Sequence, residues 1–593
     1  MSLKDLLSPF YVWKRAFEKP YTDKKPLQDR PGAERYRGFH KNDQEKCVGC
    51  GTCEAICQNA AIDMVPVKNI ETGLHDSGLR PRIDYGRCCW CSLCVDICPS
   101  GSLSMSNEYI WADPDSESFR FIPGVDSKPW EKKEKGYKRS KGYGLLNYSR
   151  IGMKTLPLDQ SLNSFLEIVK GYSREEAKAE AMRCVDCGLC VASCPAHMDI
   201  PDYIQAIRED DLSKALKLLY LTNPLPATCG RICTHNCEEV CALGVLGEPI
   251  AIRWLKRYIV DQIDKNQYNH ILGEKFESRK EKIAIIGAGP AGLSAAYYLV
   301  TLGYKIKIFE ATDKAGGMIR WGVPEYRMPA DQLDKEVEYI INLGVQIEYK
   351  TKVGKDIAFR EIYAEYDAIF ISIGMNIPYK MEIPGEENPS VLPGLDFLDA
   401  VARDKKPVLG KSVAVIGGGN VAMDAARTAR RLGSKVTVFY RRRKKDMPAD
   451  QEEIEEAQAE QIEIITQTIP VKIEQSEDEK LLFTWNKAKM VDQGLGKRPK
   501  PIPIPKDVQT GKFDSVIPAI GQGPDYSFLT EDFLERIQFK RYKLRINRFG
   551  QTTDLKVFAG GDITNEKADA ISAIADGYMV ARGIDRFLTN KKQ

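Results

Sequence analysis

The sequence predicts a multidomain protein of α+β and α/β class, with cysteine-rich domains followed by dinucleotide-binding domains. Its 593 residues correspond to about four domains. All 17 cysteines fall between Cys47 and Cys241, in groups whose spacing is typical of ligands to metal clusters. Beyond them come two glycine-rich turns, at 287–292 and 417–422, each between a strand-like apolar run and a helix-like run. The chain therefore combines two kinds of chemistry.

Charge and hydropathy narrow the class of protein. Lys plus Arg number 86 against 83 for Asp plus Glu, a balance that gives no sign of nucleic-acid binding. Residues 1–22 contain neither the apolar core of a signal peptide nor the ~20 apolar residues of a membrane span. We therefore expect a cytoplasmic protein without a disulfide framework. Residues 6–17 are predicted to form a surface helix on their own domain, with docking onto a partner or a membrane surface as the alternative.

Two cysteine runs near the N-terminus follow the pattern C-x2-C-x2-C-x3-C. They are Cys47, Cys50, Cys53 and Cys57, and then Cys88, Cys91, Cys94 and Cys98. A bacterial ferredoxin with two 4Fe-4S clusters has this spacing, and the fourth cysteine of each run reaches the other cluster. The expected ligand sets are Cys47, Cys50, Cys53 and Cys98, and Cys88, Cys91, Cys94 and Cys57, with Cys89 as a bystander. Zinc is the alternative, but structural zinc sites usually pair two separated C-x2-C knuckles.

The words around these runs carry a resemblance. "RYRGFH" at 35–40, and "RIDYGRCCWCSLCVDICPSGSL" around the second run, resemble the ferredoxin-type subunit of respiratory complex I and of related hydrogenases. The likeness covers about residues 30–110 and implies a module that docks inside a larger redox complex. Residues 108–155 have no sustained period and are predicted to be a linker draped over neighbouring surfaces.

Helical apolar spacing begins near residue 156, and a capping box at Ser173 and Glu176 predicts a helix start. This stretch holds the other eight cysteines, which suffice for two further 4Fe-4S clusters. They are Cys184, Cys187, Cys190, Cys194, Cys229, Cys233, Cys237 and Cys241.

The segments "EAMRC", "CPAHMDIP", "NPLPATCGRIC" and "EPIAIRWLKRY" resemble the N-terminal helical domain of the glutamate synthase small subunit. Dihydropyrimidine dehydrogenase and NADH-dependent ferredoxin:NADP oxidoreductase share this domain. The resemblance implies one cluster on Cys194, Cys233, Cys237 and Cys241, and another on Cys184, Cys187, Cys190 and a fourth group. In the relatives that group is a Gln or Glu, but Lys256 stands at the matching position, and a protonated lysine has no lone pair for iron. Cys229 and a different non-cysteine ligand both remain open.

The first glycine turn is Gly287-x-Gly289-x-x-Gly292, completed by Pro290 and Ala291, and a second strand ends at Glu310. Glycines let the backbone approach a pyrophosphate at the helix N-terminus, and the acid binds ribose hydroxyls. A strand, a helix and an acid in this order predict a dinucleotide fold.

The second turn repeats the design. It comprises Gly417, Gly419, Asn420, Val421 and Ala422. Tyr440 stands where the ribose-binding acid is expected, and Arg441, Arg442 and Arg443 follow it. Guanidinium groups bind a 2′-phosphate that a carboxylate repels, so the sequence predicts NADP(H). The alternative is a solvated basic turn.

The resemblance to the glutamate synthase small subunit continues over about residues 155–590 and implies FAD in the first fold. It implies FAD contacts from Gly316, Gly317, Arg327, Gly561 and Asp562. It also implies that the NADP domain is inserted into the FAD domain. The expected domains are an N-terminal extension (1–45), a two-cluster ferredoxin domain (46–107), a linker (108–155), a helical iron–sulfur domain (156–270), an FAD-binding domain (280–395 and 506–593) and an NAD(P)-binding domain (396–505).

These features predict an iron–sulfur flavoprotein subunit of a cytoplasmic oxidoreductase complex. It moves electrons between NADP(H) and four 4Fe-4S clusters through FAD, and we name no catalytic side chain because the cofactors carry the chemistry. Expected partners are a hydrogenase, a formate dehydrogenase, a 2-oxoacid:acceptor oxidoreductase or a bifurcating flavoprotein; ferredoxin is also a candidate. The alternatives are a glutamate synthase-type small subunit that serves a biosynthetic large subunit, and a non-enzymatic cluster-bearing assembly subunit. A disulfide reductase is excluded because no cysteine follows Cys241.

Overall fold

The structure is a computed structural model. It describes residues 10, 12–13, 15–19, 32–68, 70, 76–140, 144–273, 277–405, 407–494 and 497–590. The chain divides into two compact units, Met1–Ser149 with Val185–Leu189 and Val240–Pro249, and the remainder of the chain. The surface helix expected over 6–17 falls largely outside the described residues. No helix in the described ranges has the length and apolarity needed to cross a membrane.

Short strands and helices build the first unit around its cysteines. β1 (His40–Asn42) pairs antiparallel with β4 (Leu103–Met105), and β2 (Ile62–Pro66), β3 (Leu79–Asp84) and β5 (Arg120–Phe121) form a second antiparallel sheet. Helices α2 (Thr52–Ala55) and α3 (Leu93–Ile97) carry Cys53 and Cys94 into the core. The unit also contains η2 (Ser116–Phe119) and η3 (Ala242–Val245).

The segment expected as a linker contributes to this core. β5 pairs with β3, and Phe121 and Trp130 are each only 2% exposed. Trp130 stacks on Phe39 with 4.3 Å between ring centroids. The aromatic side chains between 108 and 140 thus pack against the cysteine loops without needing a regular period, which is why the sequence pattern gave no sign of it.

The second unit begins with helices whose apolar faces pack together. α5 (Arg174–Ala181) starts at Ser173 with the predicted capping box, so that prediction is confirmed. The other helices of this part are α4 (Leu158–Leu162), α6 (Leu189–Ser193), α7 (Ile200–Arg208), α8 (Leu212–Tyr220), α9 (Pro226–Ile232), α10 (Asn236–Glu239), α11 (Ile252–Gln262), η4 (Lys265–Gln267) and α12 (Tyr268–Leu272).

A five-stranded parallel sheet, in the order β21-β9-β6-β7-β8, forms the first dinucleotide fold. Its strands are β6 (Lys282–Ile286), β7 (Lys305–Phe309), β8 (Gln346–Glu348), β9 (Ala368–Ile371) and β21 (Val557–Ala559). Its helices include α13 (Pro290–Thr301), α14 (Met318–Trp321), α15 (Ala330–Asn342), α16 (Phe359–Glu365), α20 (Glu531–Leu534) and α21 (Ala570–Asn590), and η6 (Gly561–Ile563) follows β21. Because β21 comes after the second fold in the chain, the predicted split of this domain is observed.

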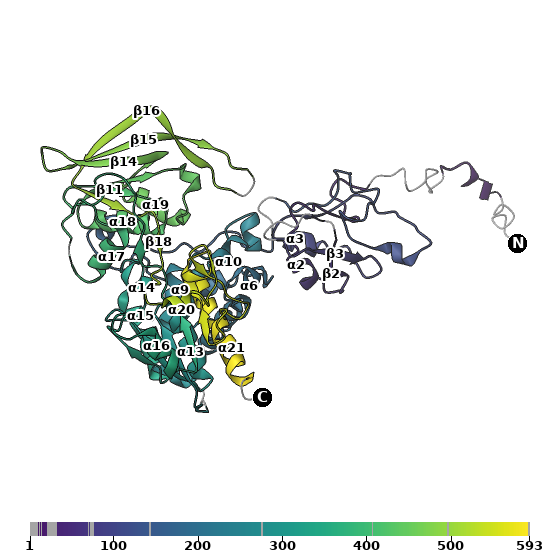
Figure 1. Ribbon diagram of the computed structural model, residues 1–593. Coiled ribbons are helices and arrows are strands. Elements are labelled where there is room, and N and C mark those ends of the chain that lie inside the picture. Colours follow the sequence, from purple (N-terminus) through teal and green to yellow (C-terminus); the bar gives the residue numbers. More distant parts are fainter. Residues whose placement is uncertain are drawn as a thin grey trace. The chain divides into compact units, whose positions relative to one another are not determined.

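A second parallel sheet has the order β13-β12-β11-β17. Its elements are β11 (Ser412–Ile416), α18 (Asn420–Arg431), β12 (Lys435–Tyr440), α19 (Gln451–Ala459), β13 (Glu463–Thr466) and β17 (Ser515–Pro518), with α17 (Gly394–Ala402) and η5 (Lys444–Asp446) beside them. An antiparallel sheet of β14 (Thr468–Gln475), β15 (Leu481–Val491) and β16 (Lys500–Phe513) extends from it (Figure 1). The inserted domain thus runs to β17, whereas the sequence placed its end at 505. Minor strands are β10 (Ile377–Pro378), β18 (Gln522–Gly523), β19 (Phe539–Lys540) and β20 (Lys543–Leu544).

Candidate functional site

Four thiols of the first unit surround one small hollow. They are Cys47, Cys50, Cys53 and Cys98, the set expected to share one cluster. Thr52 Oγ1 lies 3.2 Å from Cys50 Sγ, and Ser102 Oγ lies 3.4 Å from Cys98 Sγ. Within the described ranges, no three His, Cys, Asp or Glu side chains are placed to hold a single metal ion. Four thiols around one hollow are the number of ligands that a 4Fe-4S cluster needs.

The second expected set also comes together. Burial raises the pKa of Cys94, and the nearby thiols of Cys88, Cys91 and Cys57 add to the rise. The two cysteine loops share their backbone conformation: Gly49 and Gly51 in one, and Trp90 and Ser92 in the other, all have positive φ. Cys89 stands in this loop where the first loop has Val48, and it is exposed. Its thiol lies beside that of Cys91, which is also exposed, so the bystander role of Cys89 stays a prediction.

A third cysteine site begins in the same unit. Burial raises the pKa of the Cys50 thiol to about 11, and the neighbouring Cys187 thiol adds to the rise. Burial also raises the pKa of Cys187, and Cys241 contributes. The resemblance grouped Cys241 with Cys194, Cys233 and Cys237, but the structure places it beside Cys187. The first ferredoxin site is therefore adjacent to the cysteines of the helical sequence.

In the second unit, a lysine lies among the remaining thiols. Burial lowers the pKa of Lys256, but the thiols of Cys233, Cys229, Cys194 and Cys237 raise it above its ordinary value. The side chain is 4% exposed on α11, and Cys229 and Cys233 face it from α9 and its C-terminal end. The resemblance placed this Gln or Glu position beside Cys184, Cys187 and Cys190, whereas Lys256 lies beside Cys194, Cys233 and Cys237.

A cavity of about 350 Å³ lies at the carboxyl end of β6 in the first dinucleotide fold. The predicted residues that line it are Gly287, Gly289, Pro290, Ala291, Glu310, Gly317, Arg327, Gly561 and Asp562, with Asn420 and Val421 of the second fold. Gly287 has a φ of +101°, and a Cβ on Gly292 would lie 2.1 Å from the Gly287 carbonyl oxygen. Gly292 therefore permits close helix–strand packing, whereas its neighbours toward the N-terminus of α13 face the cavity.

Two carboxylates of this cavity are set by their surroundings. Glu310 accepts hydrogen bonds from the backbone of Ala288 at 2.7 Å and of Thr312 at 2.8 Å, which orients it at the turn. Burial, and then repulsion from Asp569, raises the pKa of Asp562 to about 6. An acid at the turn and an acid at η6 are suited to accept hydrogen bonds from hydroxyl groups of a bound dinucleotide.

The cavity wall also includes residues of the helical part. Ile232 and Thr234, the neighbours of Cys233 in the chain, line it together with Asn420 and Val421 at the N-terminus of α18. Because all of these residues belong to the second unit, a thiol site, the first fold and the second fold converge on one cavity.

Arg327 was expected to contact FAD, but its guanidinium group pairs with two acidic residues of the inserted domain. Its Nη1 donates to both carboxylate oxygens of Asp424 at 2.7 Å, and its Nη2 pairs with Glu453 at 2.7 Å. Burial, opposed by Arg327, raises the pKa of Asp424 to about 6. Arg327 lines the cavity, but the structure shows it chiefly as a bridge between the two folds.

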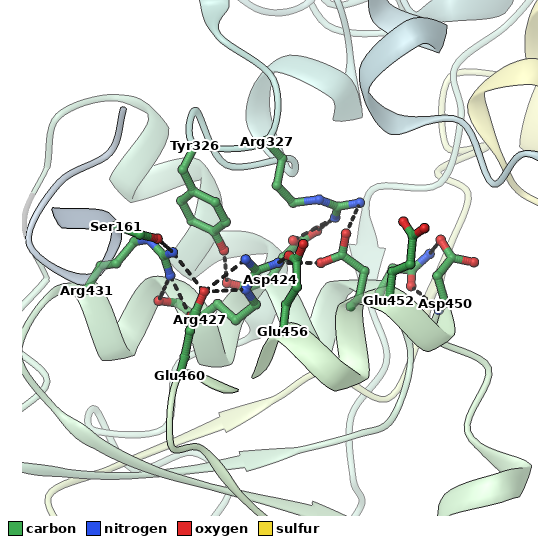
Figure 2. Close-up of polar contacts among 12 residues, drawn as sticks. Ser161, Tyr326, Arg327, Asp424, Arg427, Arg431, Asp450, Glu452, Glu456 and Glu460 are labelled. Carbon is green, nitrogen blue, oxygen red and sulfur yellow. Dashed lines mark hydrogen bonds and ion pairs between the residues drawn. The ribbon is translucent and has the colours of Figure 1, made fainter. Parts of the chain in front are cut away.

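The bridge is part of a buried network along α18 and α19 (Figure 2). Arg427 pairs with Glu453, Glu456 and Glu460, and Arg431 pairs with Glu460. Arg431 also donates to Ser161 of α4 and lies 3.9 Å from the centroid of the Tyr326 ring. Segments from the helical part, the first fold and the inserted fold are thus held by one set of charges.

Three arginines gather at the end of β12 without a carboxylate partner in the part of the chain that the structure describes. They are Arg441, Arg442 and Arg498. Burial, and then repulsion from Arg442, lowers the pKa of Arg441, and Arg498 adds to this effect. Arg442 donates to the carbonyl of Pro499 at 2.9 Å, which holds the β15–β16 connection at this place. Like charges held together suit a multiply charged anion.

Sequence reasoning missed Arg498 and Asp424. Arg498 lies in the connection between β15 and β16, far along the chain, and no local pattern links it to Arg441. Asp424 lies one helical turn after the second glycine turn. The sequence did contain a signal for it, because the 3.6-residue period places this acidic residue on the buried face of its helix.

Three family models match the chain. A 4Fe-4S dicluster domain matches residues 46–102, the 4Fe-4S domain II of dihydropyrimidine dehydrogenase matches 161–268, and pyridine nucleotide-disulphide oxidoreductase matches 281–577, half of the chain. The two iron–sulfur models coincide with the thiol sites, and the third with the two dinucleotide folds.

Curated relatives have the same character. The chain is 38% identical over 425 residues to the NADP(+)-dependent formate dehydrogenase subunit beta of Moorella thermoacetica, which is 67% of this chain but only 60% of that protein. It is 33% identical over 477 residues to the NADPH-Fe(3+) oxidoreductase subunit beta of Geobacter sulfurreducens, covering 74% of this chain and 70% of that one. It is 31% identical over 471 residues to the small chain of NADPH-dependent glutamate synthase of Escherichia coli, covering 75% and 98%. The chain therefore belongs to the pyridine nucleotide-disulphide oxidoreductases, in the group of iron–sulfur flavoprotein subunits that includes the glutamate synthase small chain.

Proposed function

We propose that this chain is the NADP(H)-dependent iron–sulfur flavoprotein subunit of an oxidoreductase complex. The observation that carries the proposal is the cavity bounded on one side by Asn420 and Val421 and on another by Ile232 and Thr234. One wall belongs to a nucleotide fold and the other flanks Cys233. A two-electron donor and a one-electron acceptor can therefore meet at a single flavin site.

The first fold fits FAD. Gly287, Gly289 and Gly317 leave the backbone open toward the cavity, Glu310 and Asp562 offer acceptors, and α13 presents its N-terminus to a pyrophosphate. FAD, when bound, takes a hydride from a nicotinamide and passes its electrons on singly, which no side chain here can do. The residues of the chain hold and orient the two dinucleotides.

The thiol sites fit 4Fe-4S clusters, and we propose four. Two are assigned to the ferredoxin sets that contain Cys53 and Cys94. A third is proposed around Cys187, with Cys241 beside it. The fourth is proposed on Cys194, Cys233 and Cys237, with Lys256 as their neighbour. Cys229 was a candidate for the other helical cluster, and we now propose it as the remaining ligand of this one. Cluster sites beside the flavin cavity and in the first unit let electrons continue to a partner surface.

NADP(H) is the proposed coenzyme because Arg441, Arg442 and Arg498 form an unpaired cationic site beyond β12. The relatives named above as NADP(+)- or NADPH-dependent agree with this choice. A partner of the formate dehydrogenase or NADPH-oxidoreductase kind is favoured over a glutamate synthase large subunit. Identity to the subunits of those two kinds is 38% and 33%, against 31% to the glutamate synthase small chain.

An anaerobic titration of the holoprotein with NADPH tests the proposal. We expect NADPH to bleach the flavin absorbance and then to produce the electron paramagnetic resonance (EPR) signals of reduced clusters, whereas NADH does so far more weakly. In a Cys233→Ser variant the flavin is still bleached, but cluster reduction slows at least tenfold. Cluster reduction at the wild-type rate in this variant would show that electrons do not leave the flavin through the Cys233 site.

A further inference from the structure

A buried histidine of the first unit contacts a thiol of the second ferredoxin set. Nε2 of His40 lies 3.3 Å from Sγ of Cys94, and Nδ1 lies 2.9 Å from the hydroxyl of Tyr85. The same hydroxyl accepts the backbone N–H of His40 at 2.8 Å. His40 is 1% exposed on β1, and it ends the "RYRGFH" segment, whose chemistry the proposed function leaves unused.

These distances decide which ring nitrogen carries the proton. The Tyr85 oxygen already accepts one hydrogen bond, and its own proton needs an acceptor because the hydroxyl is buried. In the described part of the chain, Nδ1 of His40 is the only acceptor within hydrogen-bond distance of that proton. Nδ1 is therefore the acceptor, and the N–H of the neutral ring lies on Nε2, directed at the sulfur of Cys94.

We propose that His40 is a positioning residue that donates a hydrogen bond to the Cys94 ligand and raises the reduction potential of that cluster. The inference rests on the proposed assignment of Cys57, Cys88, Cys91 and Cys94 to one cluster. Reduction adds negative charge that is shared with the ligand sulfurs, so a donor at Sγ stabilises the reduced form more than the oxidised form. Tyr85 acts through His40, since it holds the tautomer in which Nε2 is the donor.

The consequence is an asymmetry between the two ferredoxin sites. Cys50 and Cys98 of the first set receive hydroxyl contacts from Thr52 and Ser102, whereas Cys94 receives an imidazole N–H. Cys91 of the second set is exposed, so this site lies closer to the surface of its unit. A raised potential there draws electrons toward the exposed site.

The test is an EPR-monitored redox titration of the full-length holoprotein and three variants. His40→Phe keeps an aromatic ring but removes the donor, whereas His40→Gln places an amide N–H near the position of Nε2. We expect His40→Phe to lower the ratio of reduced to oxidised cluster at a fixed potential about tenfold, which is about 59 mV for one electron. His40→Gln stays within about threefold of the wild type, because its donor remains. Thr52→Val, beside Cys50, shifts only the other ferredoxin cluster and so identifies the signals.

Equal shifts in the Phe and Gln variants, or no shift in either, would overturn the proposal. Iron content is measured in every variant, and a second readout needs no loss of the ring. Wild-type protein labelled with ¹⁵N-histidine should show a weakly coupled imidazole nitrogen at the reduced cluster in pulsed EPR, and His40→Gln should lack it. A spectrum without that coupling in the wild type also refutes the hydrogen bond.

Discussion

Replacing Arg327 by Met tests whether the charge network fixes the inserted fold against the first. Among the described residues, Arg327 is the only cation that contacts Asp424. Glu453, its other partner, would still pair with Arg427 at 2.6 Å after the substitution. The substitution therefore leaves one buried carboxylate unpaired. Removing one partner of a buried pair costs about 3–5 kcal/mol, so the free energy of opening α18 should fall by that amount.

The loss should depend on pH. Burial already raises the pKa of Asp424 to about 6, and without Arg327 it rises further. A carboxyl whose folded pKa lies above its unfolded value contributes most below the unfolded value and loses this contribution as pH rises through the folded pKa. Arg327→Met should thus be more destabilising at pH 8 than at pH 5.5. Adding Asp424→Asn removes the unpaired charge and should recover most of the loss.

Native-state hydrogen exchange of peptides from α18 measures this opening without assuming that the whole chain unfolds in one step. Arg430→Met is the matched control on the same helix, because it removes one hydrogen bond, to the carbonyl of Glu460 at 3.2 Å, worth about 1 kcal/mol. If α18 in Arg327→Met exchanges within 1 kcal/mol of the wild type at pH 8, the network does not hold the inserted fold and the reasoning fails.

Three further predictions concern the cofactors and the domain contact. Arg441→Ala and Arg498→Ala should each lower NADPH affinity at least tenfold in equilibrium binding and leave NADH unaffected, because charge-assisted hydrogen bonds are worth roughly 1.5–3 kcal/mol; equal losses for both coenzymes would exclude a 2′-phosphate site. The wild type should contain about 16 iron atoms, unchanged in Cys89→Ser and lower by about four in Cys91→Ser, and an iron count near eight contradicts four clusters. Glu336 on α15 accepts hydrogen bonds from the backbone of Ala227 and Thr228 on α9. Burial raises its pKa to about 7, so its contribution to stability is lost as pH rises from about 4.5 through 7. Unfolding across this range should therefore show Glu336→Gln gaining up to about 3 kcal/mol relative to the wild type, and parallel curves would refute the shift.

The cysteine spacing and the glycine turns predicted most of the fold because both are local requirements of the backbone. Both cysteine loops place two residues in the left-handed region, Gly49 and Gly51 in one and Trp90 and Ser92 in the other. In each loop the two residues are only two positions apart in the sequence. The capping box at Ser173 is equally local. Such features need no knowledge of distant contacts, so a single sequence reveals them.

What the sequence could not supply depends on packing between distant segments. Trp130 looked like part of a linker because its partner Phe39 lies far away in the chain. The role of Arg327 as a bridge depends on Asp424, and the basic site gains Arg498 only because β15 and β16 return toward β12. In each case the residue type was visible, but the neighbour that gives it meaning was not.

Lys256 carries the same argument into the iron–sulfur region. An ammonium that is 4% exposed needs compensating negative charge, since burying an isolated charge is costly. No carboxylate pairs with Lys256 in the described ranges, and the groups that raise its pKa are the thiols of Cys233, Cys229, Cys194 and Cys237. Deprotonated thiols bound to a metal cluster supply that charge, whereas neutral thiols do not. The buried ammonium of Lys256 therefore supports the proposal that these cysteines bind an anionic iron–sulfur cluster.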